Sequence, residues 1–272
     1  METVRQEIKF NFLKNIIMRL DFQGVLPAEL EKVIIKAKAI LKEAGFNRFS
    51  ERIDNAVNLK QNPSQMESPI QSLDSIKVFS FINEKDGYSI DLSTNFITLS
   101  VESDHYSPFE KYSEIFMKIV NVYRAEIDFF TTTRLGFRKI NICLLSDITK
   151  INEYFAERYF SYNNSLSDTV PLAFSHSETF QIQPDQKVNF TCKVEHGKTP
   201  KGISYRIIID SDDYLDNQDS IDDLLTDPSG IGKMNDTLFT LYLSGVTDKL
   251  INALKGKIPL PTEDIEGIEP NG

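Results

Sequence analysis

The sequence predicts an α+β protein in which helices pack on one face of antiparallel or mixed sheets. Alternating apolar and polar residues, the pattern of half-buried strands, recur along most of the chain. Two amphipathic segments with helical spacing interrupt this alternation, and a proline opens each of them. The order strand, helix, strand occurs twice in the first half of the chain, which indicates weakly duplicated β-α-β units.

The elements of the first half follow from spacing and from end signals. Pro27 stands in the first turn of one helical segment, Lys42 stands in its last turn, and Gly45 follows as a C-cap. Pro108 opens the second helical segment in the same way. In order, we expect a strand at 8–22, a helix at 27–45, a strand at 46–53, a polar connection at 54–75, a hairpin at 76–93, a strand at 96–103, a helix at 108–126 and a strand at 131–145.

The second half is richer in strands and in acidic residues. We expect a helix at 148–160, strands between 169 and 210, an acidic loop at 211–236 and a last helix at 237–255. The predicted organisation is an α+β domain at 1–160 with the two β-α-β-like units, a β-rich segment at 161–260 that ends in the last helix and packs on the first domain, and a flexible acidic tail at 261–272.

Composition limits the class of partner. The 40 acidic residues outnumber the 30 basic ones and give a formal net charge of −10, which argues against a nucleic-acid partner because such binding neutralises phosphates. Cys143 and Cys192 have no C-x-x-C spacing, and we expect neither a metal nor a cofactor. No apolar window approaches the ~20 residues of a membrane span, and the N-terminal segment lacks an apolar signal core. We therefore expect a cytoplasmic protein that does not bind a membrane.

The segment TTTRLGFRKINICLL (131–145) places charged and amide side chains within a predicted strand. Side chains alternate between the two faces of a strand, and here the apolar residues change parity near Arg138 and Lys139. A β-bulge at that point, eased by Gly136, would restore one continuous apolar face. Either Arg138 or Lys139 would then point outward.

With this bulge, the sequence predicts a polar row of Arg134, Arg138 and Asn141 on the outward face. Arginine forks suit carboxylates and phosphates, and asparagine both donates and accepts hydrogen bonds. The row is therefore a candidate binding site for an anion. The alternative is structural pairing of the arginines with acidic residues on neighbouring strands, such as Glu102 or Asp210.

His105 completes the set of candidate binding residues. It lies in the predicted loop Asp104-His105-Tyr106 between a strand and a helix, where functional residues concentrate. A loop histidine without a role is the alternative interpretation. The acidic run 210–219 does not match a calcium-binding loop, because Leu215 occupies the position that requires glycine. The segment 227–233 is too short for a phosphate-binding loop.

The run from FITLSVES to FTTTRLGFRKIN resembles a sporadically distributed, functionally uncharacterised bacterial family of similar length. That family combines a tyrosine and a Phe-rich helix with a later strand of the form R-x-G-[LF]-R-[YK]-I-N. The corresponding residues here are Tyr106, Phe109, Phe116, Arg134, Gly136, Phe137, Arg138, Ile140 and Asn141, and Lys139 stands where the family usually has tyrosine. The resemblance implies no known activity. The patchy distribution implies a bacterial accessory system, such as phage defence or a toxin–antitoxin-like pair.

We therefore predict a non-catalytic interaction or ligand-binding protein that holds an acidic partner segment or a small anion on Arg134, Arg138 and Asn141. The missing catalytic motifs favour this function without settling whether any catalysis occurs. The expected partner is a protein encoded nearby, or a second copy in a homo-oligomer. The alternative is an enzyme acting on an anionic small molecule or nucleotide, with an arginine clamp, a proton moved by His105, and a metal recruited by Asp210 or Asp212.

Overall fold

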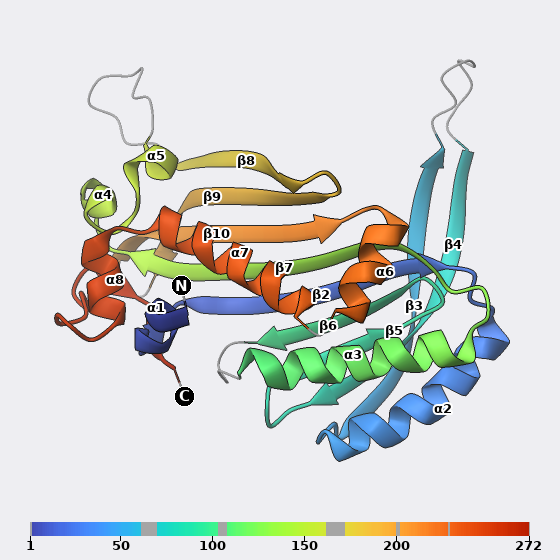
Figure 1. The fold of residues 1–272 in the computed structure, drawn as a ribbon. Coiled ribbons are helices and arrows are strands. Elements are labelled where there is room, and N and C mark those ends of the chain that lie inside the picture. Colours follow the sequence, from blue (N-terminus) through green and yellow to red (C-terminus); the bar gives the residue numbers. More distant parts are fainter. Residues whose placement is uncertain are drawn as a thin grey trace.

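One long antiparallel sheet extends through the molecule and carries the helices on one of its faces (Figure 1). The computed structural model describes residues 2–60, 70–102, 108–161, 172–199, 202–227 and 229–271. Across the sheet, the strands follow the order β3 (Arg48–Lys60), β4 (Ile70–Asn83), β5 (Tyr88–Leu92), β6 (Phe96–Glu102), β2 (Leu13–Gln23), β7 (Thr131–Leu145), β10 (Gly202–Leu215), β9 (Gln186–Thr199) and β8 (Ala173–Gln183). The short β11 (Ile265–Glu266) pairs with the end of β7.

The described helices are α1 (Glu2–Glu7), α2 (Pro27–Glu43), α3 (Phe109–Glu126), the 3-10 helix η1 (Ile148–Lys150), α4 (Ile151–Tyr154), α5 (Glu157–Phe160), α6 (Gln218–Thr226), α7 (Gly230–Gly245) and α8 (Asp248–Leu254). The long helices α2, α3 and α7 lie with α6 on the same face of the sheet (Figure 1). Within the described residues, no helix covers the opposite face. The predicted α+β fold, with helices on one face of an antiparallel sheet, is confirmed.

The two halves of the sheet repeat one topology. In the first half, β2 is followed by α2 and by the meander β3 to β6, whose last strand returns beside β2. In the second half, β7 is followed by short helices and by the meander β8 to β10, whose last strand returns beside β7. A helix on the sheet follows each meander, and β2 and β7 are neighbours at the centre. The repeat is therefore longer than the β-α-β unit that the sequence predicted.

Helices α2 and α3 form where the periodicity predicted them. At the start of α2, the Glu29 carboxylate accepts a hydrogen bond from the backbone N–H of Leu26 at 2.8 Å, which satisfies one of the free donors of the first turn. Gly45 follows the helix with a φ of +88°, a left-handed conformation that glycine adopts without strain. The buried stripe of α2 consists of Leu30, Val33, Ile34, Ala37 and Leu41.

Two predicted loops are partly regular structure. Residues 54–60 and 70–75 of the connection expected at 54–75 belong to β3 and β4, and residues 61–69 lie outside the described part of the chain. The acidic loop expected at 211–236 instead contains the end of β10, all of α6 and the start of α7. Its aspartates suggested a solvated loop, but Asp212 and Asp213 extend from β10 toward Arg134 of β7 and Gln186 of β9.

Two predicted helices are each broken by the same contact. Phe155 has an extended backbone, with a φ of −121°, and separates α4 from α5 within the helix expected at 148–160. It forms a β-bridge with Val246, which separates α7 from α8 within the helix expected at 237–255. The Phe155 side chain is fully buried, so packing outweighs the helical periodicity here.

The C-terminal segment is held to the rest of the fold. The sequence predicted a flexible tail at 261–272, but β11 pairs with β7, and β12 (Glu269–Pro270) pairs with β1 (Phe10–Asn11). The chain ends therefore meet. The domain limit predicted at residue 160 falls between α5 and β8, inside the second half of the one continuous sheet.

The apolar core between sheet and helices is divided into two clusters. One contains Leu135 and Phe137 of β7 together with side chains of α2, α3 and α6. The other contains Cys143 and Leu145 of β7 together with side chains of α4, α5 and α8. Helix α7 contributes to both clusters. The residues of β7 between these two pairs therefore lie where the apolar packing is interrupted.

We expect Gly24→Ala to lower the free energy of unfolding by about 2 kcal/mol or more. Gly24 has a φ of +92°, and a Cβ atom there would lie 1.9 Å from the backbone oxygen of Phe129. Gly197→Ala is the matched control, because a Cβ atom at Gly197 meets no atom within 4 Å. Urea unfolding of both variants measures the difference. Equal stability of the two variants would contradict the described packing of the β2–α2 turn.

Candidate functional site

Strand β7 directs its candidate residues to two different faces. The pairing of β7 with β10 is continuous from Leu135 to Leu145, so side chains alternate along this stretch without interruption. Lys139 and Asn141 share the helix side with Leu135, whereas Arg138 points to the uncovered face.

The predicted row of Arg134, Arg138 and Asn141 on one face is therefore wrong. The pairing with β2 does contain irregularities, but they lie at Thr133 of β7 and at Lys14 of β2. Neither position shifts the phase between Arg134 and Asn141, and these two side chains point to opposite sides of the sheet. The bulge expected near Arg138 does not form, because Lys139 and Asn141 are accommodated on the helix side.

On the uncovered face, both arginines are engaged with internal carboxylates. Arg138 donates from Nε to one oxygen of Asp210 at 2.8 Å and from a terminal nitrogen to the other oxygen at 2.5 Å. Arg134 donates to Asp212 at 2.8 Å. The Asp210 carboxylate raises the pKa of Arg138. The structural pairing of Arg138 with Asp210, given as the alternative for this face, is confirmed. Both side chains stay partly exposed.

The remaining candidate, His105, lies outside the described residues, as do its neighbours Asp104 and Tyr106. His105 is therefore not assigned to a site.

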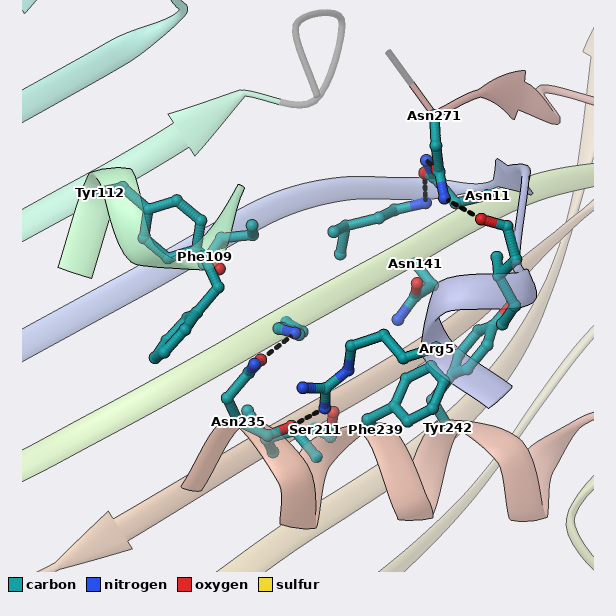
Figure 2. A pocket seen from close by; sticks show the side chains of 15 residues that line it. Arg5, Asn11, Phe109, Tyr112, Asn141, Ser211, Asn235, Phe239, Tyr242 and Asn271 are labelled. Atoms are coloured by element: carbon teal, nitrogen blue, oxygen red, sulfur yellow. Dashed lines mark hydrogen bonds between the residues drawn. The ribbon is translucent and has the colours of Figure 1, made fainter. Parts of the chain in front are cut away.

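On the helix side, a cavity of about 120 Å³ opens between the sheet and α7 (Figure 2). Leu13 and Ile16 of β2 and Leu238 of α7 supply aliphatic lining, and Phe109 of α3 and Phe239 of α7 add aromatic rings. The cavity lies between the two core clusters, next to the polar residues of β7.

The polar lining comes from strands, from helices and from both ends of the chain, where Asn11 and Asn271 also line the cavity. Lys139 and Asn141 come from β7, Ser211 comes from β10, Asn235 comes from α7 and Arg5 comes from α1. Figure 2 shows Asn141, Ser211, Asn235 and Arg5 around the same space. Ser211 is the direct cross-strand partner of Lys139. Side chains at such positions have Cβ atoms about 5 Å apart.

Some of these polar groups are paired within the protein. The Lys139 ammonium donates to the Asn235 side-chain oxygen, and the Asn141 amide donates to the backbone oxygen of Ile209 at 3.4 Å. Arg5 donates to the backbone oxygen of Asn235 at 3.3 Å and forms an ion pair with Asp236 at 2.9 Å.

Two buried hydroxyl groups at the cavity are not paired. Ser211 is 1% exposed and Tyr242 is 9% exposed, and within the described residues neither hydroxyl has a hydrogen-bond partner. A buried polar group without a partner costs about 1–3 kcal/mol, so native proteins rarely keep one without a reason. Both residues line the cavity, so a bound molecule can supply the missing partners.

The electrostatics of the cavity are dominated by Lys139. Burial and, to a lesser extent, the nearby positive charge of Arg5 lower the pKa of its amine to about 7, and Asp236 acts in the opposite direction. Within the described residues, no carboxylate lies at ion-pair distance from the Lys139 nitrogen. Burial also raises the pKa of the Tyr242 hydroxyl, which keeps its proton. The cavity therefore holds a cation and two free hydroxyl groups in a largely apolar enclosure.

Sequence reasoning found part of this site and missed the rest. Lys139 and Asn141 were in the charged strand that drew attention, and the simple alternation of that strand places both beside Leu135 and Phe137. Ser211 lay hidden in an acidic run, and nothing local distinguishes Asn235 or Tyr242 from ordinary helix residues. Their proximity depends on the β7–β10 register and on the position of α7.

The described part of the chain contains neither a cluster of metal-ligating side chains nor a membrane-spanning helix. No group of three or more His, Cys, Asp or Glu side chains is arranged to hold a metal ion. None of the described helices combines the length and the hydrophobicity that a membrane span needs.

We expect Lys139→Met to raise the free energy of unfolding by about 1 kcal/mol at pH 6. The pKa of Lys139 is about 7 in the folded protein and about 10.4 in an unfolded chain, so folding is opposed by burial of the charge below pH 7, and this cost fades toward pH 10. The gain should therefore be largest at pH 6 and small at pH 10. Urea unfolding at both pH values measures it, with the exposed Lys233→Met as control. Destabilisation at pH 6 would mean that the folded protein already satisfies the ammonium.

Comparisons with known proteins add nothing to this geometry. No family model and no curated protein matches the chain. Among solved structures, a crystal structure of the di-domain ARO/CYC StfQ from the steffimycin biosynthetic pathway aligns with 88% of this chain and 98% of that one. The alignment has a TM-score of 0.18 and 8% sequence identity, values at which no structural likeness can be argued.

Proposed function

We propose that this protein binds a small anionic molecule in the cavity between the sheet and α7, with the Lys139 ammonium as the main charge contact. One observation carries the proposal: Lys139 faces a cavity in which no described carboxylate pairs with it and two buried hydroxyl groups have no partner. Lys139 is half-buried as a residue, but its amine is desolvated in the cavity. A desolvated charge without a counterion is costly, and an anion would remove that cost. The predicted small-anion ligand is kept, but its place moves from the arginines to Lys139.

The donors in the cavity suit a carboxylate. The Lys139 ammonium supplies a charge-assisted hydrogen bond, and the hydroxyl groups of Ser211 and Tyr242 are both able to donate to an oxygen acceptor. The paired arginines of the uncovered face offer less, because an external anion would compete with Asp210 and Asp212.

The size of the cavity restricts the ligand to a small molecule. Its volume is about 120 Å³, slightly less than the ~150 Å³ of an engineered cavity that accommodates benzene. Ligand sites for drug-sized molecules are about 300–1,000 Å³, so a whole nucleotide does not fit. The aliphatic and aromatic lining favours a short organic acid over a hydrated inorganic ion.

The other parts of the predicted function stay predictions. These are the role in a bacterial accessory system, a protein partner encoded nearby, and a homo-oligomer. An acidic partner segment on the uncovered face would have to displace the carboxylates that hold Arg134 and Arg138.

We expect lactate to bind the wild-type protein at pH 6.5 and Lys139→Met to weaken the binding at least tenfold, which corresponds to about 1.4 kcal/mol and is the usual scale of a lost charge-assisted hydrogen bond. Isothermal titration calorimetry measures the affinity, with propionate and inorganic phosphate as further probes. Propionate should bind and phosphate should bind more weakly.

Arg138→Gln is the matched control for this titration, because it removes a cation of the same strand from the opposite face. Its affinity for lactate should equal that of the wild type. Loss of binding in Arg138→Gln with retention in Lys139→Met would place the anion on the uncovered face. Failure of the wild type to bind either lactate or propionate would refute the proposed cavity site.

We expect lactate binding to depend on pH through Lys139. The free amine has a pKa of about 7, and a bound carboxylate raises it, so the affinity should be constant below pH 6 and fall by up to tenfold per pH unit above pH 7. Among the described residues, the other charged or titratable groups at the cavity are Arg5 of α1, Tyr112 of α3, and Asp236 and Tyr242 of α7. Calorimetry at pH 8 in buffers of different ionisation enthalpy should detect proton uptake on binding. A pH-independent affinity without proton uptake would exclude Lys139 as the contact.

A further inference from the structure

The surroundings of the Lys139 amine are those of a reactive group. Ser211 lies directly opposite Lys139 across the β7–β10 pair, and Tyr242 lies on the face of α7 that also carries Asn235 and Leu238. Leu238 follows Asn235 by three positions and Tyr242 follows Leu238 by four, a spacing that puts all three on one side of the helix. One cavity therefore joins an amine with two hydroxyl groups that have no partner among the described residues.

An amine attacks a carbonyl group only through its unprotonated form. An ordinary lysine has a pKa of about 10.4 and is almost entirely protonated at neutral pH. Burial and the charge of Arg5 bring the pKa of Lys139 to about 7, so a large fraction of its amine carries a free electron pair at neutral pH. Lysines that form Schiff bases share this combination of desolvation and a neighbouring cation.

We propose that the Lys139 amine forms a reversible imine with the carbonyl group of a small 2-oxo acid bound in the cavity. The inference rests on the proposed anion site and adds a covalent step to it. A 2-oxo acid has the carboxylate that the site requires and, on the adjacent carbon, the electrophile that the amine requires. The smallest members of this class are short organic acids of the size that the cavity admits.

The step needs no oxidant and no cofactor. The Nζ electron pair attacks the carbonyl carbon, a C–N bond forms, and the carbonyl π electrons move to oxygen. Transfer of one proton from nitrogen to that oxygen gives a neutral carbinolamine. Donation of a second proton to the hydroxyl group lets the C–O bond break with loss of water, which leaves a protonated imine. Amine, 2-oxo acid and one proton thus give the iminium ion and one water.

The hydroxyl groups of Tyr242 and Ser211 have different roles in imine formation. Burial raises the pKa of the Tyr242 hydroxyl, so this group keeps its proton and donates a hydrogen bond to the carbonyl oxygen, while the proton taken up by the departing hydroxyl group comes from solvent. Ser211, as the cross-strand neighbour of Lys139, is placed to relay the proton between nitrogen and oxygen. The iminium keeps one positive charge in the cavity, so the ligand carboxylate retains its partner after the bond has formed.

The experiment traps the imine in the full-length protein. Wild-type protein is incubated with pyruvate and sodium cyanoborohydride at pH 7, where hydride from the reagent reduces an iminium to a stable secondary amine. Intact-protein mass spectrometry should show one adduct per chain, and peptide mapping should place it on Lys139. Lactate, which has no carbonyl group, should give no adduct and should slow adduct formation by pyruvate.

Variants separate the proposed chemistry from general lysine reactivity. Lys139→Arg should lose the adduct. Lys233→Arg, which alters an exposed lysine of α7, should react like the wild type. Tyr242→Phe should form the adduct at least tenfold more slowly even at saturating pyruvate, which separates an effect on the covalent step from weaker binding. At sub-saturating pyruvate, the trapping rate should fall as the pH drops below 7, with an apparent pKa near 7, which a merely structural lysine would not produce.

The outcomes distinguish this inference from the proposed function. Lactate binding that depends on Lys139, without any pyruvate adduct on Lys139, would overturn the imine and leave the anion site intact. Slow adducts spread over exposed lysines, equal in wild type and Lys139→Arg, would also overturn it. Rapid modification of Lys139 that lactate blocks would support both.

Discussion

The structure depends on a polar break in its core, where β7 and β10 turn Lys139, Asn141 and Ser211 toward the helices. Apolar residues continue the same face in both directions, so two hydrophobic clusters form instead of one. Close packing of aliphatic side chains against the break would desolvate an ammonium and leave its hydrogen-bonding capacity unused. The cavity is the consequence: the sheet and α7 stay far enough apart for polar groups to meet each other or a ligand.

The ends of the chain complete this enclosure. Arg5 of α1 reaches the backbone of Asn235, which is distant in sequence, and Asn11 bonds with Asn271 beside the pairing of β1 with β12. The duplicated topology accounts for the rest, because it brings the first strands of both halves together at the centre of the sheet. The site therefore forms only when nearly the whole chain has folded, and its affinity is coupled to overall stability.

The sequence was sufficient for the fold class and for helices whose periodicity agrees with their packing, as in α2 and α3. It failed where tertiary contacts override local pattern. Phe155 and Val246 break two helices at once, and Asp212, expected in a loop, lies in β10, where it pairs with Arg134 of β7. At the site, the assumption that Ile140, Ile142 and Leu144 must share one apolar face with Leu135 and Phe137 produced the bulge that does not exist. Plain alternation would have placed Lys139 and Asn141 correctly. Ser211 and Tyr242 could not have been found, because only the register of β10 and the position of α7 bring them to Lys139.

The same physical cause underlies both functions inferred for Lys139. Desolvation opposes the charged amine, and a pKa of about 7 means that charged and neutral forms coexist at neutral pH. The charged form attracts a carboxylate, whereas the neutral form is the nucleophile, so a lysine with an ordinary pKa would bind without reacting. A much lower pKa would give a nucleophile without attraction for an anion. A bound 2-oxo acid is compatible with both the attraction of a carboxylate and the attack by a neutral amine. Formation of the iminium restores the positive charge beside the carboxylate. The free energy spent on burying the amine is then recovered in the liganded state, as expected for a site that sacrifices stability for function.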